Sequence, residues 1–379
     1  MRINGLRPNV RPAGSGEETA MKTSFRVFAG IGIFALAAAL SAAPAAPDKP
    51  RDPFIFGDQT VPPGQAASGF LEVPAGDTDP ATRIPVTVLH GRNPGPILAL
   101  VTGVHAYEYP PILALYRIRD MLRGEELSGT LIIVHIANLP GFQKRIIYYN
   151  PYDWKNLNRV FPGDPKGSQS QRIAHVLNTE VIQKCDALID MHCGDGNEAL
   201  IPYTYWMIGP DPAVSEKARN MALAFGVPTI IIDDSRTQDL KDSKYLGNTA
   251  LLQGKPAITT EWGYLGRTDE IAIQKNVDGV LSVMRFLRMI DGDPDMVKHP
   301  VWIDKYEVVY STHDGLFFPE VEMGQYVAAG QPVGYITDYF GDRIETLAAP
   351  FEGIMLYIIN TPPANKGEPL FEVGQVKRD

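Results

Sequence analysis

Two histidines and one glutamate in this chain have the residue types and spacing of metal ligands. His105 and Glu108 are three residues apart in GVHAYEYPP, between an apolar run and a proline pair that can open a helix. His192 follows the apolar run ALIDM and enters a glycine-containing loop. Two imidazoles and one carboxylate suit Zn²⁺ and leave a fourth position open for water. Taken singly, each residue could instead be a solvated loop residue or a buried core histidine.

Other polar residues could complete a catalytic site around such a metal. Glu261 follows the apolar run PAITT and could act as a general base and then as a general acid. Asp190 lies two residues before His192 and could orient its imidazole. Asn158 and Arg159, in a loop rich in turn residues, could bind a substrate carboxylate through hydrogen bonds and a bidentate pair. A surface glutamate and an arginine tied to a structural aspartate are the alternative interpretations.

The elements that must position these residues alternate between apolar runs and helical patterns. This alternation predicts an α/β sandwich with a largely parallel or mixed sheet, in which functional loops follow the carboxyl ends of strands. Continuous apolar runs indicate central strands that are covered on both faces. The predicted strands are 84–89, 97–101, 131–136, 187–191, 229–232 and 257–260, and the predicted helices are 111–122, 170–183, 212–225 and 271–289.

The ends of the chain differ in composition from its middle. From Met21, a basic start, an apolar run over 27–40 and the small residues SAA are typical of a signal peptide, and the run is too short for a bilayer span. We therefore expect an exported protein, periplasmic or secreted, with no stable membrane anchor after cleavage. The predicted organisation is a leader and signal peptide over 1–46, an N-terminal arm over 47–69, a catalytic domain over 70–290, a linker over 291–299 and a small all-β domain over 300–379.

Composition excludes some classes of protein. The net charge of −9 argues against a general nucleic-acid binder, which normally carries a basic face. The 35 glycines and 32 prolines argue against a coiled coil or a helical array. Cys185 and Cys193 flank a predicted strand, so their separation of about 26 Å predicts two free, buried thiols rather than a disulfide.

The residues of these motifs and their order along the chain resemble those of the succinylglutamate desuccinylase/aspartoacylase branch of the zinc carboxypeptidase superfamily. The segment GVHAYE at 103–108 is similar to the family's G-x-H-x-x-E, although members more often have Gly-Asn between the two ligands. LIDMH at 188–192, NLNRVFPG at 156–163 and TTEWG at 259–263 match its third-ligand, carboxylate-clamp and general-base segments. The resemblance covers roughly residues 65–290.

The resemblance implies one Zn²⁺ per chain, held by His105, Glu108 and His192. It also implies that Glu261 is the general base and that Asn158 and Arg159 hold the substrate carboxylate. Members often carry an arginine before the clamp that polarises the scissile carbonyl. The nearest arginine here is Arg145, in FQKRIIYYNPYD, to which we carry this role.

The predicted activity is the hydrolysis of an amide bond in a small molecule or peptide that has a free carboxylate. An N-acyl amino acid deacylase is favoured by the resemblance, whereas an exported metallocarboxypeptidase acting on peptides or cell-wall peptides suits the predicted location. A non-catalytic carboxylate-binding protein is the third alternative. The C-terminal segment resembles a biotinyl/lipoyl-carrier fold without the modifiable lysine, which predicts a barrel-like β-domain with a structural or gating role.

Overall fold

The computed structural model describes residues 51–378. The predicted leader and signal peptide over 1–46 lie outside the described residues. None of the helices within 51–378 has the length and apolar character needed to cross a bilayer.

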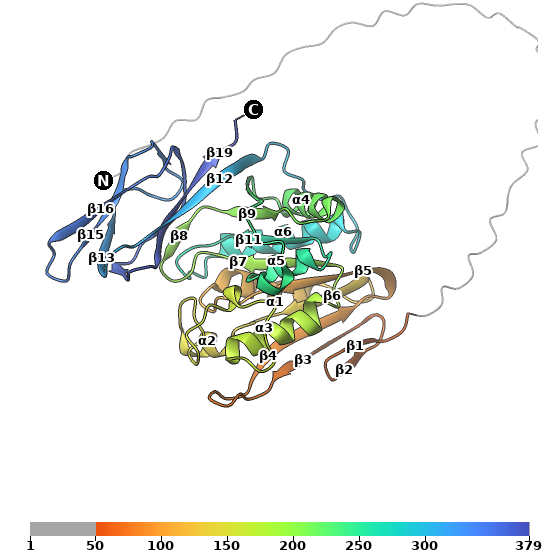
Figure 1. Cartoon of the computed structure of the whole chain (residues 1–379). Coiled ribbons are helices and arrows are strands. Elements are labelled where there is room, and N and C mark those ends of the chain that lie inside the picture. The colour runs from red at the N-terminus through yellow and green to blue at the C-terminus, as the bar shows by residue number, and fades with distance from the viewer. Residues whose placement is uncertain (1–50, 379) are drawn as a thin grey trace, which may run out of the picture. The chain divides into compact units, whose positions relative to one another are not determined.

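A mixed sheet of 13 strands organises the described part of the chain (Figure 1). At its centre β5, β6 and β7 run parallel, and β7 is also parallel to β11. Beyond β11 the direction reverses, because β9 is antiparallel to β11 while β10 is parallel to β9. The mixed α/β sheet predicted from the alternating pattern is therefore present. Its strands up to β11 are β3 (Gln65–Val73), β4 (Thr82–His90), β5 (Asn93–Val101), β6 (Ser128–Val134), β7 (Ala187–His192), β8 (Glu198–Leu200), β9 (Tyr203–Met207), β10 (Thr229–Asp233) and β11 (Ala257–Glu261).

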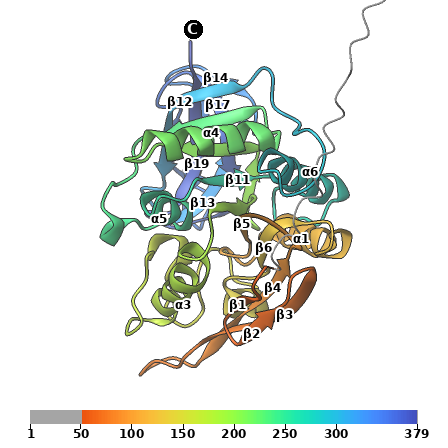
Figure 2. The same ribbon diagram turned by 90° about the vertical axis from the view of Figure 1, so that its right-hand side faces the viewer.

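Helices cover both faces of this sheet. Figure 2 shows α1 and α6 on one side of the central strands and α3 and α5 on the other, and α6 packs against both α1 and α4. Prolines occupy the first turns of α1, α2 and α4, where no backbone N–H is lost to the helix. The helical segments are α1 (Tyr109–Met121), α2 (Leu139–Lys144), η1 (Leu157–Arg159), α3 (Gln169–Leu177), η2 (Asn178–Ile182), α4 (Pro212–Phe225), η3 (Leu240–Asp242), α5 (Leu246–Leu252) and α6 (Glu270–Phe286).

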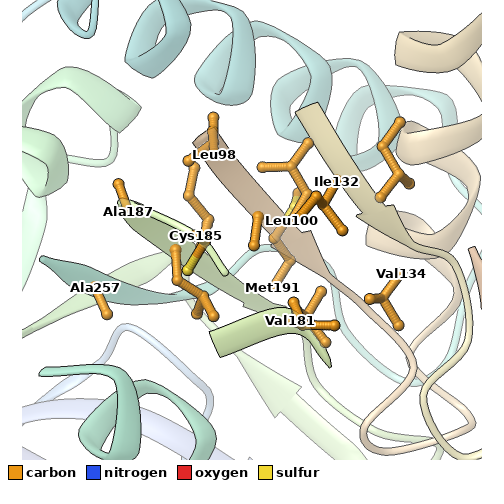
Figure 3. Packing of buried hydrophobic residues seen from close by; sticks show 14 of the residues in the cluster. Leu98, Leu100, Ile132, Val134, Val181, Cys185, Ala187, Met191 and Ala257 are labelled. Carbon is orange, nitrogen blue, oxygen red and sulfur yellow. The ribbon is translucent and has the colours of Figure 1, made fainter. Parts of the chain in front are cut away.

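The main hydrophobic core lies along the central parallel strands. Leu98 and Leu100 from β5 pack with Ile132 from β6 and Met191 from β7, all fully buried (Figure 3). Every residue of β7 is buried, including polar Asp190 and His192 at its end. Both cysteines, at either end of this strand, are buried and unpaired. A strand that is covered on both faces has no polar alternation, which is why these segments read as continuous apolar runs.

The C-terminal strands do not form the barrel expected from the carrier-like pattern. Four of them, β14, β17, β19 and β12, extend the main sheet, with β12 parallel to β10, and β8 adds to this part by pairing with β17. Four others form a separate sheet in the order β16-β15-β13-β18, and neither sheet closes on itself within 51–378. The C-terminal strands are β12 (Val301–Tyr310), β13 (Gly315–Pro319), β14 (Tyr326–Val327), β15 (Pro332–Thr337), β16 (Arg343–Ala348), β17 (Gly353–Ile359), β18 (Pro363–Ala364) and β19 (Pro369–Val376).

The segment expected as an N-terminal arm also contains regular structure. Residues 54–56 and 59–61 form a small antiparallel hairpin of β1 (Phe54–Phe56) and β2 (Gln59–Val61). The following strand, β3, pairs with β4 along its whole length and forms one edge of the main sheet. Part of the predicted arm is therefore built into the sheet.

Candidate active site

The proposed metal ligands meet because β5 and β7 are parallel neighbours whose carboxyl ends lie at one edge of the sheet. The chain leaves β5 through Gly103, whose φ of +67° and close approach to Ile136 leave no room for a side chain. This turn carries His105 to the sheet edge, and Glu108 stands immediately before α1. Ligand atoms of His105, Glu108 and His192 lie within 4.8 Å of one another. The structure thus brings together the three residues predicted as metal ligands.

Hydrogen bonds orient both imidazoles in the same sense. Nδ1 of His105 and Nδ1 of His192 each lie 2.8 Å from a carboxylate oxygen of Glu108. On the far side of each ring, Nε2 of His105 lies 3.0 Å from the side-chain oxygen of Asn156, and Nε2 of His192 lies 2.9 Å from Asp190. An Nε2–H that donates to these oxygens leaves each Nδ1 lone pair directed at the centre of the group, as metal-binding histidines require.

The donor set fits a cation. Oε2 of Glu108 is buried and lies 2.8 Å from Nδ1 of His192, so the two atoms meet as two ligands of one ion would. Burial opposes a positive charge on His192, but Asp190 and Glu108 outweigh it and raise the pKa of the imidazole well above its usual value. Burial also opposes the charge of Glu108, whose pKa is nevertheless lowered by the two imidazoles. The group therefore stabilises positive charge at its centre.

Glu261 lies beside this group because β11 is the other parallel neighbour of β7. Its register pairs Glu261 with His192, so the two side chains lie next to each other at the carboxyl ends of the strands. Burial, reinforced by neighbouring carboxylates including Glu108, raises the pKa of Glu261 well above its usual value. A carboxyl group with a raised pKa can both accept and return a proton near neutral pH.

The other three predicted site residues, Asn158, Arg159 and Arg145, differ in their distance from the metal group and in their exposure. Asn158 reaches the group, but its side-chain oxygen accepts from the backbone N–H of Leu246 and its amide nitrogen lies 3.4 Å from Asp190. These are the contacts of a residue that positions the ligands. Arg159 is exposed and lines the cavities beside the metal group. Arg145 is also exposed, ends α2 in a left-handed conformation, and lines neither of the two cavities described below.

A small cavity of about 110 Å³ lies on one side of the metal group and contains an arginine that the sequence did not single out. Arg236 and Arg159 stack on the ring of Tyr245, with Cζ at 3.7 and 4.6 Å from its centroid. Arg236 is 84% buried and forms an ion pair with fully buried Asp233, yet its Nη1 has no hydrogen-bond partner. We call this the basic cavity, lined by His105, Arg159, His192, Arg236, Tyr245 and Glu261 among others.

A larger cavity of about 380 Å³ adjoins it and is lined mainly by glutamate and tyrosine side chains. It shares Arg159 and Glu261 with the basic cavity, but its further walls come from β8 and from the C-terminal strands β12, β17 and β19. Its remaining charged residues are three other glutamates, together with tyrosine rings. We call this the acidic cavity, lined by Glu108, Glu198, Glu261, Glu372, Tyr203, Tyr205 and Tyr357 among others.

The chain is similar in sequence to known proteins. A model described as the succinylglutamate desuccinylase/aspartoacylase catalytic domain matches residues 94–287. An N-alpha-acetyl-L-2,4-diaminobutyric acid deacetylase from Halomonas elongata is 31% identical over 280 residues, which cover 71% of this chain and 79% of that protein.

Solved structures show the same fold over nearly their whole length. A succinylglutamate desuccinylase/aspartoacylase from Rhodobacter sphaeroides superposes with a TM-score of 0.71 at 26% identity, covering 83% of this chain and 96% of that one. A product-bound ectoine utilization protein from Ruegeria pomeroyi superposes with a TM-score of 0.73 at 24% identity, and the match covers 86% of this chain and 98% of that one. The likeness extends beyond residues 94–287, so it includes part of the C-terminal strands.

Proposed function

Because the chain belongs to the succinylglutamate desuccinylase/aspartoacylase family, we propose that it is a zinc-dependent deacylase that hydrolyses the amide bond of an N-acyl amino acid. The deacetylase relative supports this class of reaction. The observation that carries the proposal is the shared orientation of His105 and His192. Both direct Nδ1 at Glu108 while Nε2 is held by another side chain.

His105, Glu108 and His192 would hold one zinc ion. When bound there, zinc supplies polarisation of the scissile carbonyl and makes water more acidic. Glu261 accepts the proton that water loses as its oxygen adds to the carbonyl carbon. Glu261 then returns that proton to the amine nitrogen as the C–N bond breaks, which its raised pKa favours. Asp190 fixes the His192 ring throughout.

The substrate carboxylate would bind in the basic cavity. Arg236 offers a buried nitrogen that no protein group satisfies, and Asp233 and Tyr245 hold its guanidinium in place. Arg159 approaches the same Tyr245 ring and adds a second guanidinium. Guanidinium groups suit carboxylates because they can donate two parallel hydrogen bonds. In this proposal Arg159 and Arg236 form the clamp in the basic cavity, which Asn158 also lines, and the exposed Arg145 lies outside that cavity.

Substitution of the proposed base tests the mechanism. Glu261→Gln should keep one zinc per chain, measured by elemental analysis, and lose at least about 10³-fold in kcat. The matched control is Glu270→Gln at an exposed, salt-bridged position outside both cavities, which should leave kcat and zinc content unchanged. Full turnover in Glu261→Gln would overturn the assignment of the base, and a wild-type chain without stoichiometric zinc would overturn the metal.

A substrate panel tests the class of reaction. We expect the wild-type chain to release amine from N-acetyl amino acids and to leave short peptides intact. Faster cleavage of peptides would establish the metallocarboxypeptidase alternative. Carboxylate binding without turnover of either class would establish the non-catalytic alternative.

We further propose export, which is supported by the basic start, apolar run and small residues over 21–46. N-terminal sequencing of the protein recovered from its native host should find a mature chain that begins close to residue 47. A cytoplasmic chain that retains residues 21–46 would contradict export.

A further inference from the structure

One row of side chains on the C-terminal part of the sheet faces the active site. The strand registers place Glu372 of β19 between Val308 of β12 and Tyr357 of β17, and Tyr357 next to Leu200 of β8. Residues that pair directly across neighbouring strands point to the same face of a sheet. All four of these residues line the acidic cavity. The C-terminal strands therefore contribute one wall of the cavity beside the metal group.

Glu372 is an unusual residue to find in this row. It is 1% exposed and lies between the core residues Phe371 and Val373, which point to the other face of β19. Its Oε2 is buried and has no hydrogen-bond partner. Burying a carboxylate without a partner costs several kcal/mol, so a position that served only for packing would favour an apolar side chain. The side chain lines the cavity, where a bound group could reach it.

Glu198 faces the same cavity from β8, which is separated from β19 by β17. It lies two residues before Leu200 on β8 and pairs with Ile359, so it shares the face of the row that contains Glu372. One of its oxygens accepts from the backbone N–H of Asp195 at 3.2 Å. The rings of Tyr203 and Tyr357 also line this space. Carboxylates combined with tyrosine rings form a site that suits an organic cation.

We propose that Glu372 and Glu198 bind an ammonium group on the side chain of the substrate, so that the enzyme prefers N-acyl amino acids with a second, basic amino group. The inference rests on the proposed function, since it takes the substrate carboxylate to lie between Arg159 and Arg236. A substrate with a carboxylate at one end and an ammonium at the other would match the guanidinium groups of the basic cavity and the carboxyl groups of the acidic cavity. Glu372 is a specificity-determining residue in this proposal.

The electrostatics of the cavity agree with this assignment. Burial and the neighbouring carboxylates of Glu198 and Asp233 raise the pKa of Glu372 to about 8, against a weaker opposing effect of Arg236. Burial likewise raises the pKa of Glu198. An ammonium group brought into contact with Glu372 favours the ionised form of its carboxyl. Binding at neutral pH should therefore release a proton from Glu372 to the solvent.

Calorimetric binding of two product-like probes to the purified full chain tests the proposal. L-2,4-diaminobutyrate and L-2-aminobutyrate share the α-carbon groups and differ in the γ-ammonium. We expect the wild-type chain to bind the diamino acid about 30-fold more tightly, and Glu372→Gln to abolish most of this ratio. The control Glu307→Gln makes the same substitution at an exposed residue of β12, the strand next to β19, and should keep the ratio.

Titration in two buffers of different ionisation enthalpy should show that the wild-type chain releases up to one proton per diamino acid bound at pH 7. Glu372→Gln should release less, an effect that a purely structural role would not produce. If Glu372→Gln fails to fold, Glu198→Gln provides the same comparison from a different strand. Equal affinity of the wild-type chain for both probes, or an unchanged ratio in a folded Glu372→Gln, would overturn the ammonium site.

Hydrolysis assays separate this inference from the proposed function. Selective binding of the diamino acid without hydrolysis of any N-acetyl amino acid would support the ammonium site and overturn the deacylase. Hydrolysis of Nα-acetyl-L-2,4-diaminobutyrate no faster than of N-acetyl-L-2-aminobutyrate or N-acetyl-L-aspartate would support the deacylase and overturn the preference.

Discussion

The two cavities beside the metal group differ in how their charges are satisfied. In the basic cavity, Arg236 is paired with Asp233 and stacked on Tyr245, and its buried Nη1 has no hydrogen-bond partner. In the acidic cavity, Glu372 is buried with no hydrogen-bond partner for its Oε2, and burial raises its pKa to about 8. The guanidinium of Arg236 is already charged and can bind an anion directly. The carboxyl group of Glu372 is neutral at neutral pH and becomes charged only when a cation binds beside it.

The two cavities also differ in origin. The basic cavity is built from residues between His105 and Glu261, within the segment that matches the family model. The acidic cavity uses the metal group and Glu261 as well, but Glu372 and Tyr357 come from beyond that segment. In our proposal the α/β core therefore carries the hydrolytic chemistry, and the C-terminal strands adapt it to one kind of substrate side chain.

Among substitutions of residues that line only one of the two cavities, the largest loss of activity should come from that of the buried Arg236 in the basic cavity. Arg236→Lys keeps the charge but loses the planar fork, so we expect kcat/KM to fall about 100-fold for every N-acetyl amino acid, whatever its side chain. Steady-state kinetics with basic, neutral and acidic substrates measures this. Arg219→Lys is the control, because Arg219 also stacks on aromatic rings but lies outside both cavities. A loss confined to basic substrates would show that the carboxylate binds elsewhere.

A substitution beside the metal group should lower activity toward basic and neutral substrates by the same factor. Asp190→Asn weakens the hydrogen bond that orients His192, and zinc affinity should fall about 10- to 100-fold. Competition with a chromophoric chelator measures this affinity. The relative rates for basic and neutral substrates should not change once zinc is restored. An unchanged affinity would mean that Asp190 does not act through His192.

Within the acidic cavity, Glu198 should matter less than Glu372. One oxygen of Glu198 already accepts a backbone hydrogen bond, so we expect Glu198→Gln to weaken the binding of L-2,4-diaminobutyrate about 10-fold. The double variant with Glu372→Gln should lose less than the product of the two single effects, because both residues contact one ammonium group. Multiplicative losses would indicate two independent sites.

The smallest effect should be on stability. Between pH 4.5 and 8 the Glu372 carboxyl loses its proton in the unfolded chain but keeps it in the folded protein, because its folded pKa is about 8. The folded state is therefore destabilised as pH rises through this range. Glu372→Gln removes the effect, so its Tm advantage over the wild-type chain should grow by roughly a few degrees from pH 5 to pH 8. A constant difference in Tm would contradict a raised pKa.

The sequence alone located much of the metal group. His105, Glu108, His192 and Glu261 could be found because each follows an apolar strand, and parallel neighbours bring their carboxyl ends to one edge. Arg236 could not be found by that rule. It follows β10, which runs opposite to β7 and β11, so a rule based on the carboxyl ends of parallel strands would not place it in one cavity with Glu261. Asn158 was recognised as part of the site, but its partners depend on where Asp190 and Leu246 lie in space.

The sequence by itself thus determined the alternation of strands and helices and the residues that follow strands, because both are local properties of the chain. Only the tertiary structure decided which side chains share a cavity. The segment PLFEVGQV reads as a strand, but its register against β12 and β17 is what turns Glu372 toward the cavity beside the metal group rather than toward the core that Phe371 and Val373 occupy. A shift of one residue would reverse every side chain of that strand, and the forces that fix the register act between segments far apart in the sequence.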